Sequence, residues 1–191
     1  MDSGQHAERP RSGFLSTLLK LVGLVALVIV LSTALRTFVF QAYEIPSGSM
    51  EETIMTGDMV FSEKVSYYFR DVEPGDIVTF NDPLSPGRVL IKRVIAVGGQ
   101  VVDINNDDGL VCVDGEPLQE PYTDGLPSYR LDNSIANVTY PYRVPEGELW
   151  VMGDNRTNSQ DSRYFGSIDR DTVTGRGALI YWPLDHFGLL E

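Results

Sequence analysis

A long apolar stretch near the N-terminus is the strongest pattern in the chain. No charged residue occurs from Leu21 to Leu35, and Phe38 and Phe40 continue the apolar character. The 20 residues from Leu21 to Phe40 would form about 30 Å of helix, which matches the hydrocarbon thickness of a bilayer. The pattern therefore predicts one membrane-spanning helix over residues 14 to 41.

This stretch has two other interpretations. A buried helix of a soluble protein would require the rest of the chain to surround a segment that is apolar on every face. A cleaved signal peptide also has a basic start and an apolar core, but the bulky Phe38 and Phe40 stand where small residues would precede a cleavage site. An uncleaved signal-anchor fits the pattern best.

Charge is divided unevenly along the chain. Arg9, Arg11 and Lys20 precede the apolar stretch, whereas Arg36 alone follows it. The positive-inside bias then predicts a cytoplasmic tail over residues 1 to 13 and an extracytoplasmic domain over residues 42 to 191, in a single-pass protein of the cell membrane. Residues 1 to 42 carry a net charge of +2, so the −12 of the whole chain leaves −14 for residues 43 to 191. Such an acidic domain lacks the cationic surface that binds nucleic acid.

Short apolar runs alternate with turn signals throughout the second part of the chain. Pro74-Gly75-Asp76 and Asp114-Gly115 are typical turn signals, and no sustained helical period follows residue 42. This pattern predicts a mainly β fold with antiparallel strands. Residues 105 to 143 are rich in Asn, Asp, Pro and Tyr and predict a smaller β-ribbon insertion. The predicted strands cover residues 59–61, 76–80, 89–97, 100–104, 110–113, 148–152 and 178–182.

The counts of cysteine and histidine limit the possible chemistry. Cys112 is the only cysteine, so the chain has neither an internal disulfide nor a cysteine-rich zinc or iron–sulfur site. The only histidines are His6 and His186, so a Ser-His-Asp enzyme would depend on His186 alone. Composition therefore points away from histidine chemistry.

Two polar segments are candidates for a functional site. In Ile45-Pro46-Ser47-Gly48-Ser49-Met50, the proline and the glycine predict a turn that presents the two serines, although ordinary linkers share this composition. Residues 153 to 166 form a dense polar loop directly after a predicted strand. Asx turns closed by ion pairs, with Asp161 and Arg163 as partners, would explain this loop equally well.

Lys92 is the third candidate. Alternation along residues 89 to 97 places Lys92 on one face with Leu90, Val94 and Ala96, so the lysine is the single charge on an apolar face. Burial there lowers the pKa of the lysine and leaves part of the amine neutral, as a general base requires. The alternative is a lysine whose stem packs while its ammonium group reaches water.

Together these segments resemble the type I signal peptidases, the membrane-anchored Ser/Lys endopeptidases. The resemblance implies an antiparallel β-sheet catalytic domain with a smaller β-ribbon insertion, preceded by one transmembrane helix. It also implies a serine endopeptidase that removes N-terminal signal peptides from exported preproteins at the membrane surface. The family's motifs appear in order along residues 43 to 182: Ile45-Pro46-Ser47-Gly48-Ser49-Met50, Gly57-Asp58 with Lys64, Pro74-Gly75-Asp76, Ile91-Lys92-Arg93-Val94, and the loop from Gly153 to Gly166.

The resemblance assigns roles to individual residues. Ser49 corresponds to the nucleophile and Lys92 to the general base, which act through an acyl-enzyme without a metal or an organic cofactor. The Ser47 hydroxyl and the Ser49 N–H correspond to the oxyanion hole, and Ser159 to the hydroxyl that orients the lysine. Framework ion pairs correspond to Arg93 with Asp154 and to Arg163 with Asp161, and the positions near the substrate pocket are Ile45, Pro46, Ile54, Leu90 and Ile91.

The resemblance also implies partners, and one position departs from it. Signal peptides of secreted preproteins, membrane lipids and the protein-export machinery are the expected partners. Glu52 stands where the family usually has a proline, and the loss of a fixed φ predicts a looser turn. A catalytically inactive, membrane-tethered β binding module and a self-cleaving regulator of the Ser/Lys fold remain as alternatives. The sequence leaves open which preproteins are processed and whether the peptidase is general or dedicated to pili.

Overall fold

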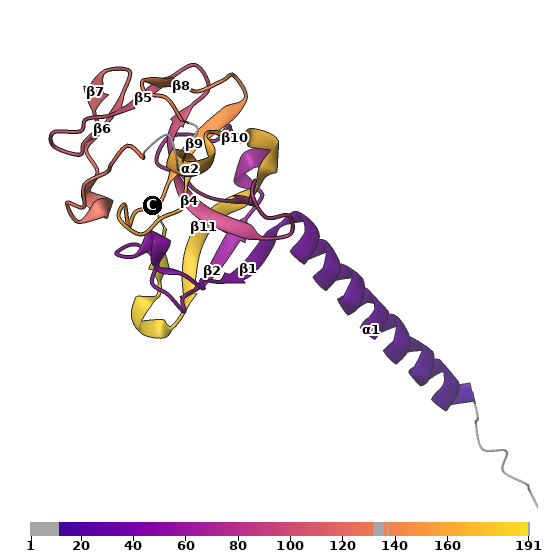
Figure 1. Cartoon of the computed structure of the whole chain (residues 1–191). Coiled ribbons are helices and arrows are strands. Elements are labelled where there is room, and N and C mark those ends of the chain that lie inside the picture. The colour runs from indigo at the N-terminus through magenta and orange to yellow at the C-terminus, as the bar shows by residue number, and fades with distance from the viewer. Residues whose placement is uncertain (1–11, 132–135, 137, 191) are drawn as a thin grey trace, which may run out of the picture. The chain divides into compact units, whose positions relative to one another are not determined.

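One helix, α1 (Ser12–Phe38), makes up most of the described N-terminal unit (Figure 1). The chain divides into two compact units, Met1–Val39 and Phe40–Glu191. The computed structural model describes residues 12 to 131, 136 and 138 to 190, so residues 1 to 11 of the predicted cytoplasmic tail lie outside it. The stretch Gly13–Phe38 is long and apolar enough to cross a membrane. Its apolar side chains face all sides, which suits an apolar surrounding.

The helix ends three residues before the predicted boundary at residue 41. From Phe40 the chain continues as β1 (Phe40–Glu44), which pairs antiparallel with β2 (Met59–Glu63). Phe40 lies opposite Glu63, so the backbone groups of this segment bond across a sheet instead of along a helix. The apolar pattern alone does not reveal this strand, because Phe40 continues the apolar character of the helix.

Antiparallel pairing builds an eight-stranded main sheet in the second unit (Figure 1). The strands predicted at residues 89–97 and 148–152 coincide with β4 and β9, whereas β11 begins five residues before the predicted strand at 178–182. In spatial order the sheet contains β1, β2, β11 (Val173–Trp182), β3 (Ile77–Asn81), β4 (Val89–Val97), β9 (Glu148–Met152) and β10 (Ile168–Asp169), with β12 (Gly188–Leu189) also paired to β11.

Short helical turns connect several of these strands. One is an α-helical turn and the others are 3-10 turns, of which η1 carries one candidate serine. They are α2 (Ser162–Phe165), η1 (Gly48–Met50), η2 (Ser66–Tyr68), η3 (Pro121–Thr123), η4 (Arg170–Thr172) and η5 (Leu184–His186).

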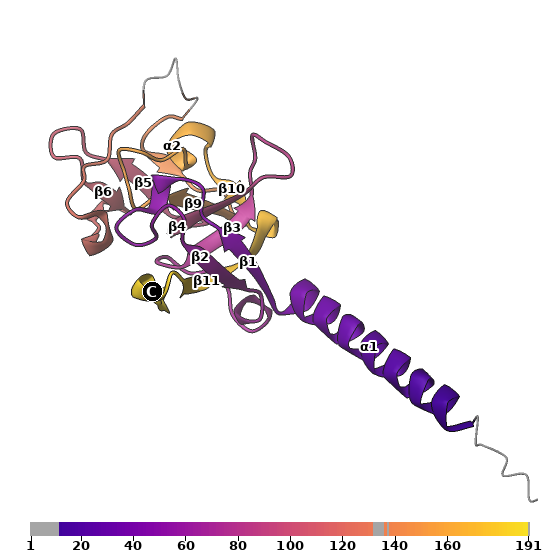
Figure 2. The same ribbon diagram turned by 90° about the horizontal axis from the view of Figure 1, so that it is seen from below.

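A smaller four-stranded sheet corresponds to the predicted insertion. Figures 1 and 2 show it beyond β9, on the side away from β1 and β2. The predicted limits of 105 to 143 leave out its central strand, which the apolar pattern alone does not separate from the main domain. In spatial order this sheet contains β7 (Glu116–Pro117), β6 (Val111–Val113), β5 (Val101–Ile104) and β8 (Tyr142–Arg143).

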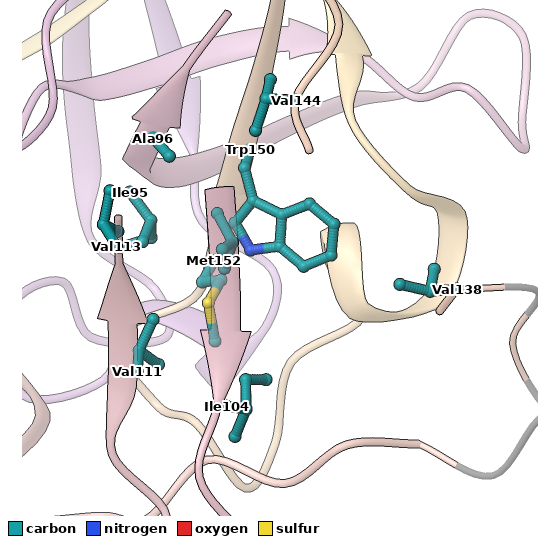
Figure 3. Packing of buried hydrophobic residues seen from close by; sticks show 10 residues of the cluster. Ile95, Ala96, Ile104, Val111, Val113, Val138, Val144, Trp150 and Met152 are labelled. Carbon is teal, nitrogen blue, oxygen red and sulfur yellow. The ribbon is translucent and has the colours of Figure 1, made fainter. Parts of the chain in front are cut away.

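One hydrophobic cluster joins the two sheets. Trp150 and Met152 of β9 are fully buried, and they pack with residues of β5 and β6. Figure 3 shows the indole ring beside Met152. Because the sheets share this core, the insertion is part of the same folded unit. The cluster contains Ile95, Ala96, Val102, Ile104, Val111, Val113, Val138, Val144, Trp150 and Met152.

The strand β4 follows the predicted alternation at Leu90, Ile91 and Val94. Leu90 and Val94 pack in one cluster together with Phe80 and Val151, whereas Ile91 packs in another. Ile95 and Ala96, however, both pack in the cluster around Trp150. A register shift in the pairing of β4 with β9 lies at this point and interrupts the alternation.

Candidate active site

Ser49 lies in the 3-10 turn η1, within the connection between β1 and β2. The backbone N–H of Ile45 donates to the carbonyl of Asp58 at 2.9 Å, and Gly57 N–H donates back to the Ile45 carbonyl at 2.8 Å. These bonds close the connection into a loop. Met50, next to the serine, is fully buried in the core, so the turn is anchored while Ser49 itself keeps 9% exposure.

Lys92 of β4 reaches this turn from the main sheet. Its Nζ atom donates to Ser49 Oγ at 2.7 Å and to the Ile91 carbonyl at 2.8 Å. The side chain is only 2% exposed. Burial lowers the pKa of the amine to about 8, although the carboxylates of Asp161 and Asp154 act to raise it. About a tenth of the lysine is therefore neutral at pH 7 and half of it at pH 8.

Asp154 connects three segments around the serine and the lysine. Its Oδ1 accepts from Arg93 Nε at 2.9 Å, and its Oδ2 accepts from Arg93 Nη2 at 2.8 Å and from Thr53 Oγ1 at 2.5 Å. Arg93 also donates to the carbonyl of Gly75 at 3.0 Å. Since Arg93 follows Lys92 and Thr53 belongs to the turn after the serine, one buried carboxylate links the base strand, the serine loop and the polar loop.

A second buried ion pair stabilises the polar loop from within. Asp161 accepts from Arg163 Nε and Nη2, both at 2.9 Å, and from the Gly153 N–H at 3.0 Å. Burial by itself raises the pKa of the Asp161 carboxyl, but the hydrogen bonds and the charge of Arg163 outweigh it and hold that pKa below its usual range. The carboxylate stays ionised, and its charge acts on Lys92.

The polar loop packs directly against the backbone of the candidate nucleophile. Asn155 N–H donates to the Ser49 carbonyl at 3.2 Å. A Cβ atom on Gly153 would lie 2.3 Å from that carbonyl oxygen and 2.3 Å from Ser159 Oγ. Only a residue without a side chain fits this close approach.

The structure does not contain the hydrogen bond from Ser159 to Lys92 that the family resemblance implies. Ser159 Oγ is buried and has no hydrogen-bond partner among the described residues. The hydroxyl lies close enough to Asp161 to help lower the pKa of that carboxyl. In this structure the lysine is held by Ser49 and Ile91, and the role of Ser159 stays a prediction.

The turn after the serine is closed by two backbone hydrogen bonds. Thr53 N–H and Ile54 N–H both donate to the Met50 carbonyl, at 3.0 and 2.7 Å. Glu52 has φ +77°, as the third residue of a type II turn requires. A proline, whose φ is fixed near −65°, does not fit this backbone, and the prediction that the turn is looser than one with a proline stays a prediction.

Residues that precede Ser49 and residues of β4 line a small apolar cavity of about 40 Å³. Four of the five predicted pocket residues lie here, namely Ile45, Pro46, Leu90 and Ile91. Ile54 is fully buried in the core with Met50 and is not part of this lining, and its place near the pocket stays a prediction. Tyr43, Glu44, Thr79 and Val89 complete the lining.

Ser47, the predicted oxyanion donor, precedes η1 in an extended conformation, and its side chain makes no capping hydrogen bond.

His186 Nδ1 lies 2.8 Å from Asp58 Oδ1, and this hydrogen bond raises the pKa of the histidine. Lys92 contacts the Ser49 hydroxyl, whereas His186 contacts Asp58. Within the described residues, no three His, Cys, Asp or Glu side chains gather in a way that could hold a metal ion.

Several contacts at this site have no signal in the sequence. Thr53 binds Asp154, and the insertion supplies Glu120 and Tyr122 to the loop that contains Arg156. Arg156 belongs to a recognised motif, but its partners lie some 30 residues away in a stretch without an apolar pattern. No local signal reveals such a pairing.

This geometry defines a class of site. A serine hydroxyl in contact with a buried amine of lowered pKa supplies the two groups that nucleophilic catalysis needs, a nucleophile and a base. The model of the family described as signal peptidase, peptidase S26, matches residues 18–182. The chain belongs to this family and is a hydrolase of the serine endopeptidase type.

Individual relatives extend over most of the chain. A probable signal peptidase I-1 of Synechocystis sp. is 39% identical over 176 residues, which cover 88% of this chain and 85% of the relative. A signal peptidase I of Mycobacterium tuberculosis is 34% identical, over 96% of this chain and 79% of the relative. The crystal structure of a signal peptidase I from Enterococcus faecalis is 28% identical, with a TM-score of 0.48, over 56% of this chain and 97% of that chain.

Proposed function

We propose that this protein removes signal peptides from exported preproteins with Ser49 as the nucleophile and Lys92 as the general base. The observation that carries the proposal is the 2.7 Å hydrogen bond between Lys92 Nζ and Ser49 Oγ. A lysine that is 2% exposed, with a pKa of about 8, supplies neutral amine at the pH of the cell exterior.

The chemistry follows from these two groups. Neutral Lys92 takes the proton of the Ser49 hydroxyl while Oγ attacks the scissile carbonyl, and a tetrahedral oxyanion forms. The ammonium then gives its proton to the leaving amine as the peptide bond breaks, which leaves an acyl-enzyme. Lys92 next takes a proton from water, whose hydroxide attacks the ester, and the released Ser49 oxygen recovers the proton.

Ser47 and the Ser49 N–H are the proposed donors to the oxyanion. The absence of a capping hydrogen bond from Ser47 leaves its hydroxyl available to a ligand. Removal of one such donor costs about 3 to 4 kcal/mol of transition-state stabilisation in other acyl-transfer enzymes.

The cavity of about 40 Å³, which is lined by residues shortly before Ser49 and Lys92 in the chain, suits small side chains such as alanine on the acyl side of the cut. Its lining is mainly apolar, so it favours an apolar side chain over a charged one. We assign its lining residues Ile45, Pro46, Leu90 and Ile91 to the recognition of signal peptides.

The proposed topology brings the site to its substrate. The apolar helix predicted over residues 14 to 41, which ends at Phe38, anchors the chain in the membrane. Residues 1 to 13 lie in the cytoplasm, and the domain predicted over residues 42 to 191 is extracytoplasmic. Ser49 follows Phe40 by nine residues, at most about 31 Å of extended chain. A signal peptide in the bilayer presents its cleavage point near the membrane surface, within reach of Ser49. Membrane lipids and the export machinery are therefore the proposed partners.

The test uses the purified full chain in detergent with a labelled preprotein. Mass analysis of the products identifies the new N-terminus. We expect one cut after a small residue in the wild type, and no cut with Ser49→Ala or Lys92→Ala, both of which keep the fold by circular dichroism. Full cleavage by either variant would overturn the assignment. Cleavage of its own chain alone would favour a self-cleaving regulator.

A further inference from the structure

A short segment of the insertion contacts the polar loop beside the active site. Arg156, which is buried, donates to Glu120 through Nη1 at 2.8 Å and through Nη2, and it donates to Ser128 Oγ at 2.8 Å. Its Nε atom donates to the carbonyl of Gly153 at 3.0 Å. The guanidinium thus joins the insertion to the first residue of the polar loop.

The ring of Tyr122 contacts two buried arginines at once. The guanidinium carbon of Arg93 lies 4.0 Å from the ring centroid and that of Arg156 lies 5.9 Å from it. The tyrosine hydroxyl donates to Glu120 Oε1 at 2.9 Å, so the ring is fixed by the carboxylate that binds Arg156. Cation–π contacts of desolvated guanidinium groups are among the stronger ones in proteins.

These contacts connect the insertion to the segments that contain Ser49 and Lys92. Arg156 fixes the carbonyl of Gly153, and the Gly153 Cα lies against the Ser49 carbonyl. Arg93, held by Tyr122 and Asp154, directly follows Lys92 in β4.

We infer that Glu120 and Tyr122 are positioning residues of the peptidase, which hold the Ser49–Lys92 pair in register from the insertion. The inference rests on the proposed function of that pair. The insertion then has two roles: it fixes the active-site framework, and it completes the core around Trp150.

Loss of the Tyr122 ring has two expected consequences. A displacement of the nucleophile or base by about 1 Å lowers the rate by up to roughly a hundredfold, and it acts on kcat more than on KM. Without the ring, Arg93 is also held less firmly against Asp154. The negative charge of Asp154 is then less compensated, and it raises the pKa of Lys92. The alkaline rise of kcat with pH therefore moves to higher pH.

The experiment compares four full-length variants in detergent with the wild type. Tyr122→Leu removes the ring, Tyr122→Phe keeps it, and Glu120→Gln removes the charge at almost constant size. Tyr68→Leu is the control, since Tyr68 is an exposed tyrosine of η2, between β2 and β3. For each protein, kcat and KM for a preprotein are measured from pH 6 to 10, and the thermal midpoint is measured by circular dichroism.

We expect kcat of Tyr122→Leu to fall by about 10- to 100-fold, with KM within about threefold and the pH profile shifted to higher pH. Tyr68→Leu keeps the wild-type profile, and Tyr122→Phe and Glu120→Gln lie between the wild type and Tyr122→Leu. Wild-type kcat and an unshifted profile in Tyr122→Leu would overturn the inference, as would an equal loss in Tyr122→Phe. If Tyr122→Leu does not fold, Glu120→Gln decides by the same two readouts. Ser49→Ala, measured in parallel, tests the proposed function separately.

Discussion

The burial of Lys92 leads to a quantitative prediction about stability and pH. The pKa of this lysine is about 8 in the folded protein, whereas lysine in an unfolded chain titrates near 10.4. Between these values the unfolded chain holds a proton that the folded protein has released, so the free energy of unfolding rises with pH. For this group alone the rise from pH 7 to pH 10 amounts to about 2 to 3 kcal/mol.

The perturbation that isolates this contribution is Lys92→Met. Methionine has a similar length and does not titrate, so the variant lacks the rise. It also loses the hydrogen bonds to Ser49 and to the Ile91 carbonyl, which costs about 1 kcal/mol each at any pH. We therefore expect the stability of the variant relative to the wild type to increase by about 2 to 3 kcal/mol on going from pH 10 to pH 7.

Urea unfolding of the full chains in detergent measures this difference. Both tryptophans, Trp150 and Trp182, lie in the Phe40–Glu191 unit, so their fluorescence reports on the unit that contains Lys92. Other groups that titrate at alkaline pH are common to both proteins and cancel. A stability difference that stays constant from pH 7 to pH 10 would refute a buried lysine of lowered pKa.

Three further predictions concern the same site. With chemistry rate-limiting, kcat increases about tenfold per pH unit below pH 7 and levels off above the Lys92 pKa of about 8; a rate that is flat from pH 6 to pH 9 contradicts a lysine base. Gly153→Ala lowers kcat about a hundredfold, because its Cβ would lie 2.3 Å from the Ser49 carbonyl oxygen. Gly23→Ala, where nothing lies within 4 Å of an added Cβ, is the control in the same preprotein assay. Glu52→Pro destabilises the protein in urea by roughly 1 to 3 kcal/mol, because φ at this position is +77°; a Glu52→Pro variant as stable as Glu52→Gly would show that the turn is not left-handed.

Sequence reasoning identified the strands whose side chains are apolar over many residues. β4 and β9 were predicted with their observed bounds, because both contribute to the core along most of their length. The two-residue strands β7, β8, β10 and β12 carry no pattern of their own and exist only through their pairing partners. The sequence pattern does not reveal β1, because its first residue continues the apolar character of the preceding helix.

Site prediction depended on a different kind of information. The motifs around Ser49, Lys92 and Asp154 identified candidate groups through their resemblance to a family. Their mutual distances, the left-handed backbone of Glu52 and the burial of Ile54 in the core came from the fold.

The sequence by itself determined what depends on neighbouring residues: an apolar helix long enough for a membrane, an acidic β domain, and polar loops rich in turn residues. Only the tertiary structure decided that Lys92 is buried against Ser49, and that Tyr122 packs on Arg93 from 29 positions away. The physical reason is that desolvation and close contact depend on atoms from distant segments, which no local pattern records. A hydrophobic period can put a lysine in a strand, but the surrounding protein determines its pKa.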